Sequence, residues 1–180
     1  TAVESLISLC PDEISIIDLD GDITQTIEKN FSAINQINLP LAVGGGIDFK
    51  KLHYYPVERV ILNSYLFDTF ESNELDITLG LQAKLGYLPF KFRGNSLLVF
   101  NSSLSDFIEI NHDRIEYFLT KVQELIFLDA EHQGRVNKDH SRIVNYLGND
   151  LVKKSYFSGG IDRQAIEYFR NKGCAGVILD

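Results

Sequence analysis

The sequence predicts an α/β protein whose parallel strands close into a TIM (βα)8 barrel with two-fold internal pseudosymmetry. Three observations support this prediction. Short apolar runs alternate with segments of helical period, a Gly-Gly-Ile-Asp phrase occurs twice, and the spacing between its copies is close to half a barrel.

The alternation of strands and helices extends over most of the chain. Apolar runs predict seven strands, at 13–22, 39–47, 58–64, 75–84, 124–131, 152–160 and 175–180. Between them, segments of helical period predict helices at 1–10, 27–37, 48–56, 113–123, 138–148 and 162–173, with a weaker one within 65–74. Strands that alternate with helices in this way favour a parallel sheet built from βα units.

The repeat is seen by comparing VGGGIDFKKL with FSGGIDRQAI and IIDLDGD with IFLDAEHQ. Gly45 and Gly159 are 159 − 45 = 114 residues apart, and Asp18 and Asp129 are 129 − 18 = 111 residues apart. One βα unit of a barrel takes roughly 30 residues, so both distances are close to four units. Two consecutive units are therefore expected to recur half a turn later.

This arithmetic predicts one barrel domain over residues 1–180, formed by strands two to eight. Seven strands and a half-turn of four units imply that the first strand of the barrel is missing from this chain. Residues 85–110 interrupt the alternation with YLPFKF and SLLVFNS on either side of Arg93-Gly94-Asn95, which predicts a hairpin-like insert after the fifth strand. A flap over the substrate and a decorated loop remain equal alternatives for this insert.

The repeated glycines indicate phosphate binding. Gly-Gly at a strand-to-helix turn allows the backbone to approach a ligand, and the first amides of the next helix carry partial positive charge. A polar strand end beside the first copy can add a carboxamide and a hydroxyl. The predicted phosphate-binding residues are Gly45, Gly46, Asn63, Ser64, Ser158, Gly159 and Gly160. Two such sites across one barrel suit a ligand with a phosphate at each end.

Composition excludes several other classes of protein. The formal net charge of −8 argues against a nucleic-acid surface, and no apolar run approaches the ~20 residues that cross a bilayer. Cys10 and Cys174 stand alone, without histidines at ligand spacing, so we expect reduced thiols, a cytoplasmic protein and no metal or other cofactor.

These residues resemble a known family. IIDLDGD, LPLAVGGGI, ERVILNS, LDAEHQG and SYFSGGI are similar, in order, to the strand ends of the histidine-biosynthesis barrels. These are phosphoribosylformimino-aminoimidazole-carboxamide ribotide isomerase and the cyclase subunit of imidazole glycerol phosphate synthase. The resemblance implies a bisphosphorylated ribotide as substrate and an Amadori (aldose–ketose) isomerisation with paired carboxylates as acid and base.

The candidate catalytic residues are Asp18, Asp129 and Gln82. Gln82 stands where the resemblance implies an aspartate at the end of the fifth strand, and a carboxamide cannot exchange a proton at neutral pH. Asp18 and Asp129 are related by the repeat, which predicts that they face each other across the ligand. The alternative is that both carboxylates cap loops and accept hydrogen bonds from helix N-termini.

Three functions remain open at this point. IIDLDGD favours the isomerase, whereas VILNS and LQAK favour the cyclase, which would imply a glutaminase subunit as partner. Gln82 favours a third function, a divergent relative that binds a phosphorylated metabolite without turnover. The isomerase is our first expectation.

Overall fold

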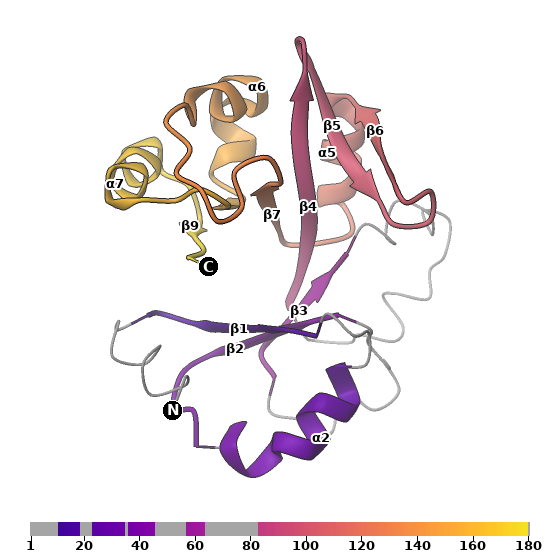
Figure 1. Cartoon of the computed structure of the whole chain (residues 1–180), viewed down its shortest axis with the longest axis vertical. Coiled ribbons are helices and arrows are strands. Elements are labelled where there is room, and N and C mark those ends of the chain that lie inside the picture. Colours follow the sequence, from indigo (N-terminus) through magenta and orange to yellow (C-terminus); the bar gives the residue numbers. More distant parts are fainter. Residues whose placement is uncertain (1–10, 19–22, 35, 46–56, 64–82, 180) are drawn as a thin grey trace. The chain divides into compact units, whose positions relative to one another are not determined.

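The computed structural model describes residues 11–18, 23–34, 36–45, 57–63 and 83–179. The chain divides into two compact units, each of which we describe by itself. Unit one comprises residues 1–61 and 71–83, and unit two comprises residues 62–70 and 84–180. Figure 1 shows the elements of both units.

The described part of unit one contains a small parallel sheet and the helix α2. Its described elements are β1 Ile14–Ile17, α2 Ile23–Ile34, β2 Leu41–Gly44 and β3 Arg59–Leu62, the last of which ends at the unit boundary. Strand β2 lies between β1 and β3, and every residue of β2 is buried. The apolar run LAV is therefore the centre of this sheet, as expected for a parallel strand with neighbours on both sides.

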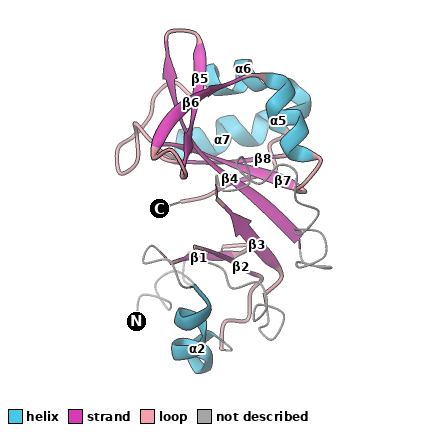
Figure 2. Cartoon of the chain, turned by 90° about the vertical axis from the view of Figure 1, so that its right-hand side faces the viewer, coloured by secondary structure: helices cyan, strands magenta, loops and turns pink. Residues whose placement is uncertain are grey.

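Among its described residues, unit two contains four parallel strands, an antiparallel extension and three helices. Its described elements are β4 Ala83–Arg93 (whose first residue belongs to unit one), β5 Ser96–Asn101, β6 Asp106–Ile110, α5 His112–Leu119, β7 Glu124–Asp129, α6 Ser141–Val152, β8 Ser155–Ser158, α7 Arg163–Lys172 and β9 Gly176–Val177. The parallel order is β4-β7-β8-β9, and β5 and β6 continue the sheet from β4 as antiparallel strands. Figure 2 shows the three helices beside these strands.

The predicted closed barrel was wrong. A barrel requires every strand to pair on both sides. Within the described residues β9 pairs only with β8, β6 pairs only with β5, and β1 pairs only with β2. The described sheet is therefore open, and the protein is α/β with parallel strands.

The segment predicted as an insert, 85–110, forms part of this sheet. Strand β4 runs on from Ala83 to Arg93, and its Leu85–Phe90 portion pairs with β7 in parallel register. The turn at Gly94 then begins the antiparallel strands, in agreement with the hairpin chemistry of the sequence. Phe92 packs edge-to-face on Tyr146 of α6, at 6.0 Å between ring centroids, so the hairpin contacts the helix layer.

Aromatic rings join β7, β8 and α7 into the core of unit two. Phe157 stacks on Phe169 at 4.3 Å and on Phe127 at 6.1 Å between ring centroids, and all three side chains are almost completely buried. Each buried aromatic contributes about 2–3 kcal/mol of hydrophobic stabilisation. This core holds the carboxyl ends of β7 and β8 in a fixed register.

The chain carries clear signals for both ends of α7. Asp162 caps its first turn by accepting a hydrogen bond from the Ala165 amide at 2.8 Å, and Gly173 ends it in the left-handed conformation. None of the described helices has both the length and the apolar character that a membrane span requires.

Candidate functional site

The repeat predicted from the sequence appears as the same local geometry in each unit. Ile17 pairs with Gly44 in unit one, and Asp18 and Gly45 follow this pair. Leu128 pairs with Ser158 in unit two, and Asp129 and Gly159 follow that pair. Gly45 has φ +114° and Gly159 has φ +81°, and a Cβ at either would lie 2.5 Å from the backbone oxygen of the aspartate. Both turns therefore require glycine for close backbone packing and for the positive φ.

In unit one, Asp18 is tied to its own βα turn. Its amide donates to the Gly44 carbonyl at 3.0 Å, and its carboxylate accepts a hydrogen bond from the Thr26 hydroxyl at 2.5 Å. Asn63 is exposed just after β3 and has an interaction partner of its own. Gly46, Ser64 and Gln82 lie outside the described residues, so their predicted roles stay predictions.

In unit two, Asp129 ends β7 as a buried carboxylate with three donors. Its Oδ1 accepts from the Glu131 amide at 3.1 Å, and its Oδ2 accepts from Asn137 Nδ2 at 2.7 Å and from His132 Nδ1 at 2.9 Å. Its side chain is 10% exposed, whereas that of His132 is 39% exposed. A carboxylate can only accept, so the hydrogen lies on Nδ1, and Nε2 of the imidazole is left to exchange protons.

The glycines predicted to bind phosphate lie beside this Asp–His pair. Ser158 and Gly159 are buried, and Gly160 is half-buried at the start of the turn into α7. Within the described part of the chain, neither the Gly159 amide nor the Gly160 amide has a backbone acceptor. The glycine turn, the first turn of α7 and the Asp–His pair are therefore brought together at the carboxyl ends of β7 and β8.

Sequence reasoning missed His132. The four histidines show no triad spacing with a serine or cysteine, so none of them became a candidate. The available signal was the spacing Asp-x-x-His directly after an apolar strand, which places both side chains in one tight loop at the strand's end. Such a signal indicates proximity, but only the fold of the loop turns Nδ1 toward the carboxylate.

His140 lies behind the same loop, against α7. Its ring centroid is 5.0 Å from that of Phe169, and its Nε2 is buried without a hydrogen-bond partner in the described residues. Burial lowers the pKa of His140 below its ordinary value, against the opposing effect of the Asp129 and Asp162 carboxylates. This lowered pKa favours the neutral imidazole of His140 in the folded protein near neutral pH.

This lowered pKa predicts a pH-dependent stability. The unfolded chain takes up a proton at His140 at a higher pH than the folded chain does. The free energy of unfolding is therefore undiminished above the ordinary pKa of 6.5 and declines as the pH falls through that value. Urea unfolding at about pH 8 and about pH 5 measures this decline, which we expect to be smaller in His140→Gln. Equal declines in both proteins would contradict the prediction.

A separate cavity of about 510 Å³ lies on unit two where the hairpin strands meet α5 and α6. Its lining residues are Asn95, Ser96, Glu109, Ile110, Asn111, Arg114 and Tyr146. Several polar groups of this lining are already paired, since Ser96 donates to Glu109 at 2.7 Å and the Tyr146 hydroxyl donates to the Ile110 carbonyl at 2.9 Å. We therefore place the candidate site at the strand ends, where an imidazole is half-exposed beside a buried carboxylate.

Comparison with known proteins adds no family. The chain matches no protein-family model and no curated protein. Within the described residues, no three or more His, Cys, Asp or Glu side chains are grouped so that they could hold a metal ion.

Proposed function

We propose that this chain binds a phosphorylated metabolite at the carboxyl ends of β7 and β8 and transfers protons on it through His132. The observation that carries this proposal is the hydrogen bond of 2.9 Å between His132 and the buried Asp129, beside the Gly159–Gly160 turn. Ligands of open parallel sheets characteristically bind outside the carboxyl ends of the strands.

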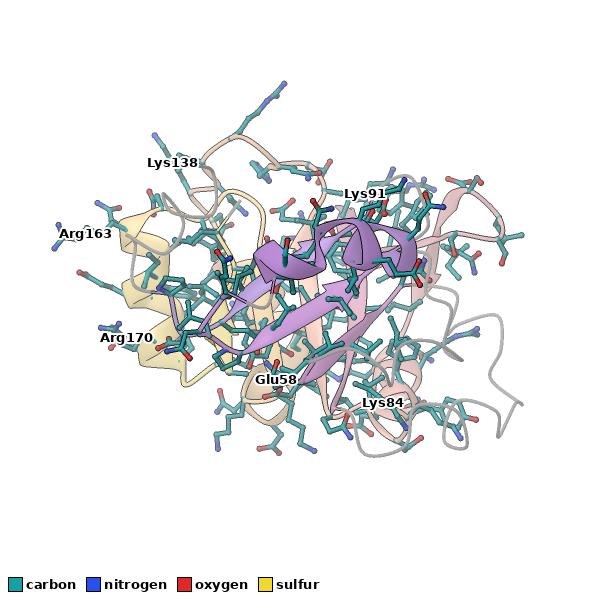
Figure 3. The ribbon with its side chains drawn as sticks, turned by 90° about the horizontal axis from the view of Figure 1, so that it is seen from below. Glu58, Lys84, Lys91, Lys138, Arg163 and Arg170 are labelled. Carbon is teal, nitrogen blue, oxygen red and sulfur yellow. The ribbon has the colours of Figure 1, made fainter. Side chains whose placement is uncertain are left out.

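The phosphate is the part of the ligand that this turn suits best. The Gly159 and Gly160 amides precede α7, whose N-terminal end carries partial positive charge. Arg163 extends from the first turn of α7, whereas Arg170 extends from its last turn (Figure 3). Arg163 thus supplies a full positive charge near the turn.

The proton chemistry suits an aldose–ketose isomerisation. In an Amadori rearrangement one group takes a proton from carbon while another returns a proton to the opened sugar, and an imidazole near neutral pH serves either step. Asp129 holds the hydrogen on Nδ1, which leaves Nε2 as the exchanging atom. The resemblance of the strand ends to the histidine-biosynthesis barrels supports an aminoimidazole-carboxamide ribotide with two phosphates as substrate.

A second candidate is binding without turnover. Both oxygens of Asp129 accept hydrogen bonds from its own loop, which is what a purely structural carboxylate does. In this case His132 stabilises the loop without transferring protons, and the function of the protein is to bind a phosphorylated metabolite.

Substitution of Arg163 tests the phosphate site. Because an exposed charge pair contributes up to about 1 kcal/mol, we expect Arg163→Ala to weaken binding of a ribose phosphate about fivefold in calorimetric titration. Arg170→Ala is the matched control, since it removes the same charge from the other end of the same helix. Equal affinities in the two variants would argue against phosphate at this turn, and no binding by the unaltered protein would refute the proposed function.

A further inference from the structure

Asn137 contacts both of the strand ends that form the candidate site. Its side-chain Nδ2 donates to Asp129 Oδ2 at 2.7 Å, and its backbone amide donates to the Gly160 carbonyl at 3.0 Å. Its Oδ1 accepts from the Asp139 amide at 2.8 Å, which fixes the orientation of the carboxamide. One residue thus ties the loop after β7 to the end of β7 and to the turn after β8.

The carboxylate oxygen that Asn137 contacts is the same one that holds His132. Asp129 Oδ2 accepts from both side chains, and the Glu131 amide donates to the other oxygen. Without the Asn137 donor, the Asp129 carboxylate loses one of the hydrogen bonds that fix the orientation of its side chain. The orientation of the His132 ring depends on that of the carboxylate, because Nδ1 donates to the same oxygen.

We propose that Asn137 is a positioning residue for His132, acting through Asp129 and through its contact with Gly160. This inference rests on the proposed function of His132 and adds a residue whose role no strand-end motif predicted. Asn137 does not exchange a proton, and its effect on turnover comes from the orientation of the imidazole.

The contact with Gly160 provides a second, independent way to disturb this arrangement. Gly160 has φ +71°, and a Cβ there would lie 2.7 Å from the Arg135 oxygen and from the Asn137 amide nitrogen. Gly173, which ends α7, has φ +70°, but a Cβ there would meet nothing within 4 Å. The alanine variants of these two glycines therefore share a positive φ and differ in whether the new methyl group displaces the segment from Arg135 to Asn137.

The first experiment compares Asn137→Asp with Asn145→Asp, an exposed position in α6. In Asn137→Asp an acceptor replaces the donor opposite Asp129, so we expect the imidazole ¹⁵N signals of His132 to shift. We also expect kcat for the phosphorylated substrate to fall about tenfold to hundredfold with KM nearly unchanged. Asn145→Asp makes the same chemical change away from the site and leaves both measurements at their original values.

The second experiment compares Gly160→Ala with Gly173→Ala by the same ¹⁵N measurement. We expect His132 signals to shift in Gly160→Ala and not in Gly173→Ala, with circular dichroism confirming that each variant is folded. If Gly160→Ala does not fold, Asn137→Asp alone decides. Unchanged His132 signals in folded Asn137→Asp overturn the inference. Lack of turnover by the unaltered protein refutes the proposed function instead, and the ¹⁵N measurement still decides whether Asn137 orients the ring.

Discussion

Replacing Gly159 by alanine is expected to lower the free energy of unfolding by about 3 kcal/mol, with contributions from positive-φ strain and from overpacking. Gly159 has φ +81°, and the new methyl group would lie 2.5 Å from the backbone oxygen of Asp129. A backbone atom held between two paired strands cannot move aside as a side chain does. Thermal unfolding should show a midpoint lower by about 10 °C for a chain of this size.

The control for this variant is Gly173→Ala. Gly173 has φ +70°, close to that of Gly159, but a Cβ there would meet nothing within 4 Å. Only the strain of the left-handed conformation remains, about 1–2 kcal/mol. If the two variants lose the same stability, close packing against Asp129 is not what requires glycine at this turn.

The repeat extends this prediction to unit one. A Cβ at Gly45 would lie 2.5 Å from the Asp18 oxygen, the same distance as in unit two. The alanine variant of Gly45 should therefore destabilise unit one as Gly159→Ala destabilises unit two, and hydrogen exchange can assign each loss to its unit.

Replacing His132 by glutamine is expected to lower kcat for the phosphorylated substrate by about 10²- to 10⁴-fold. Glutamine can still donate to Asp129, so the loop keeps its hydrogen bond, but it cannot exchange a proton. Because the phosphate binds at the glycine turn and α7, affinity for a ribose phosphate should stay nearly unchanged. Steady-state kinetics and calorimetric titration measure the two effects separately.

His112→Gln serves as the matched control for His132→Gln. His112 begins α5, and its Nε2 hydrogen-bonds to the Tyr146 carbonyl of α6. We expect this variant to lose stability and to keep its turnover, because the contact of His112 is with the α6 backbone and not with Asp129. Full activity in His132→Gln would rule out proton transfer by His132 and leave binding without turnover as the function.

Much of the local structure could be predicted from the sequence. The strands around Asp129 and Ser158 and the capped helix that starts after Asp162 lie within a few residues of their predicted ranges. The matched spacing of Asp18 to Asp129 and of Gly45 to Gly159 corresponds to matched turns in the two units. These features are local, because apolar period, capping side chains and glycine conformation act over a few residues.

Closure of the sheet could not be predicted in the same way. The barrel was inferred by counting βα units, but whether an edge strand finds a partner depends on hydrogen bonds between segments far apart in the chain. The end of β4 was misplaced for a related reason. The sequence pattern of its Leu85–Phe90 portion predicts half of a hairpin. Only the parallel register of this portion with β7 shows that it belongs to the main sheet.

The sequence by itself determined where each aspartate and glycine stands relative to its strand, since strand period and the steric freedom of glycine are properties of short segments. Tertiary structure alone decided which groups surround Asp129. Asn137 and His132 reach its carboxylate because the loop after β7 folds back onto the end of β8, and that path depends on a hydrogen bond to Gly160 and on burial of His140 against α7. Spacing along the chain places His132 near Asp129, but only the fold of the loop turns the imidazole and the Asn137 carboxamide toward the carboxylate.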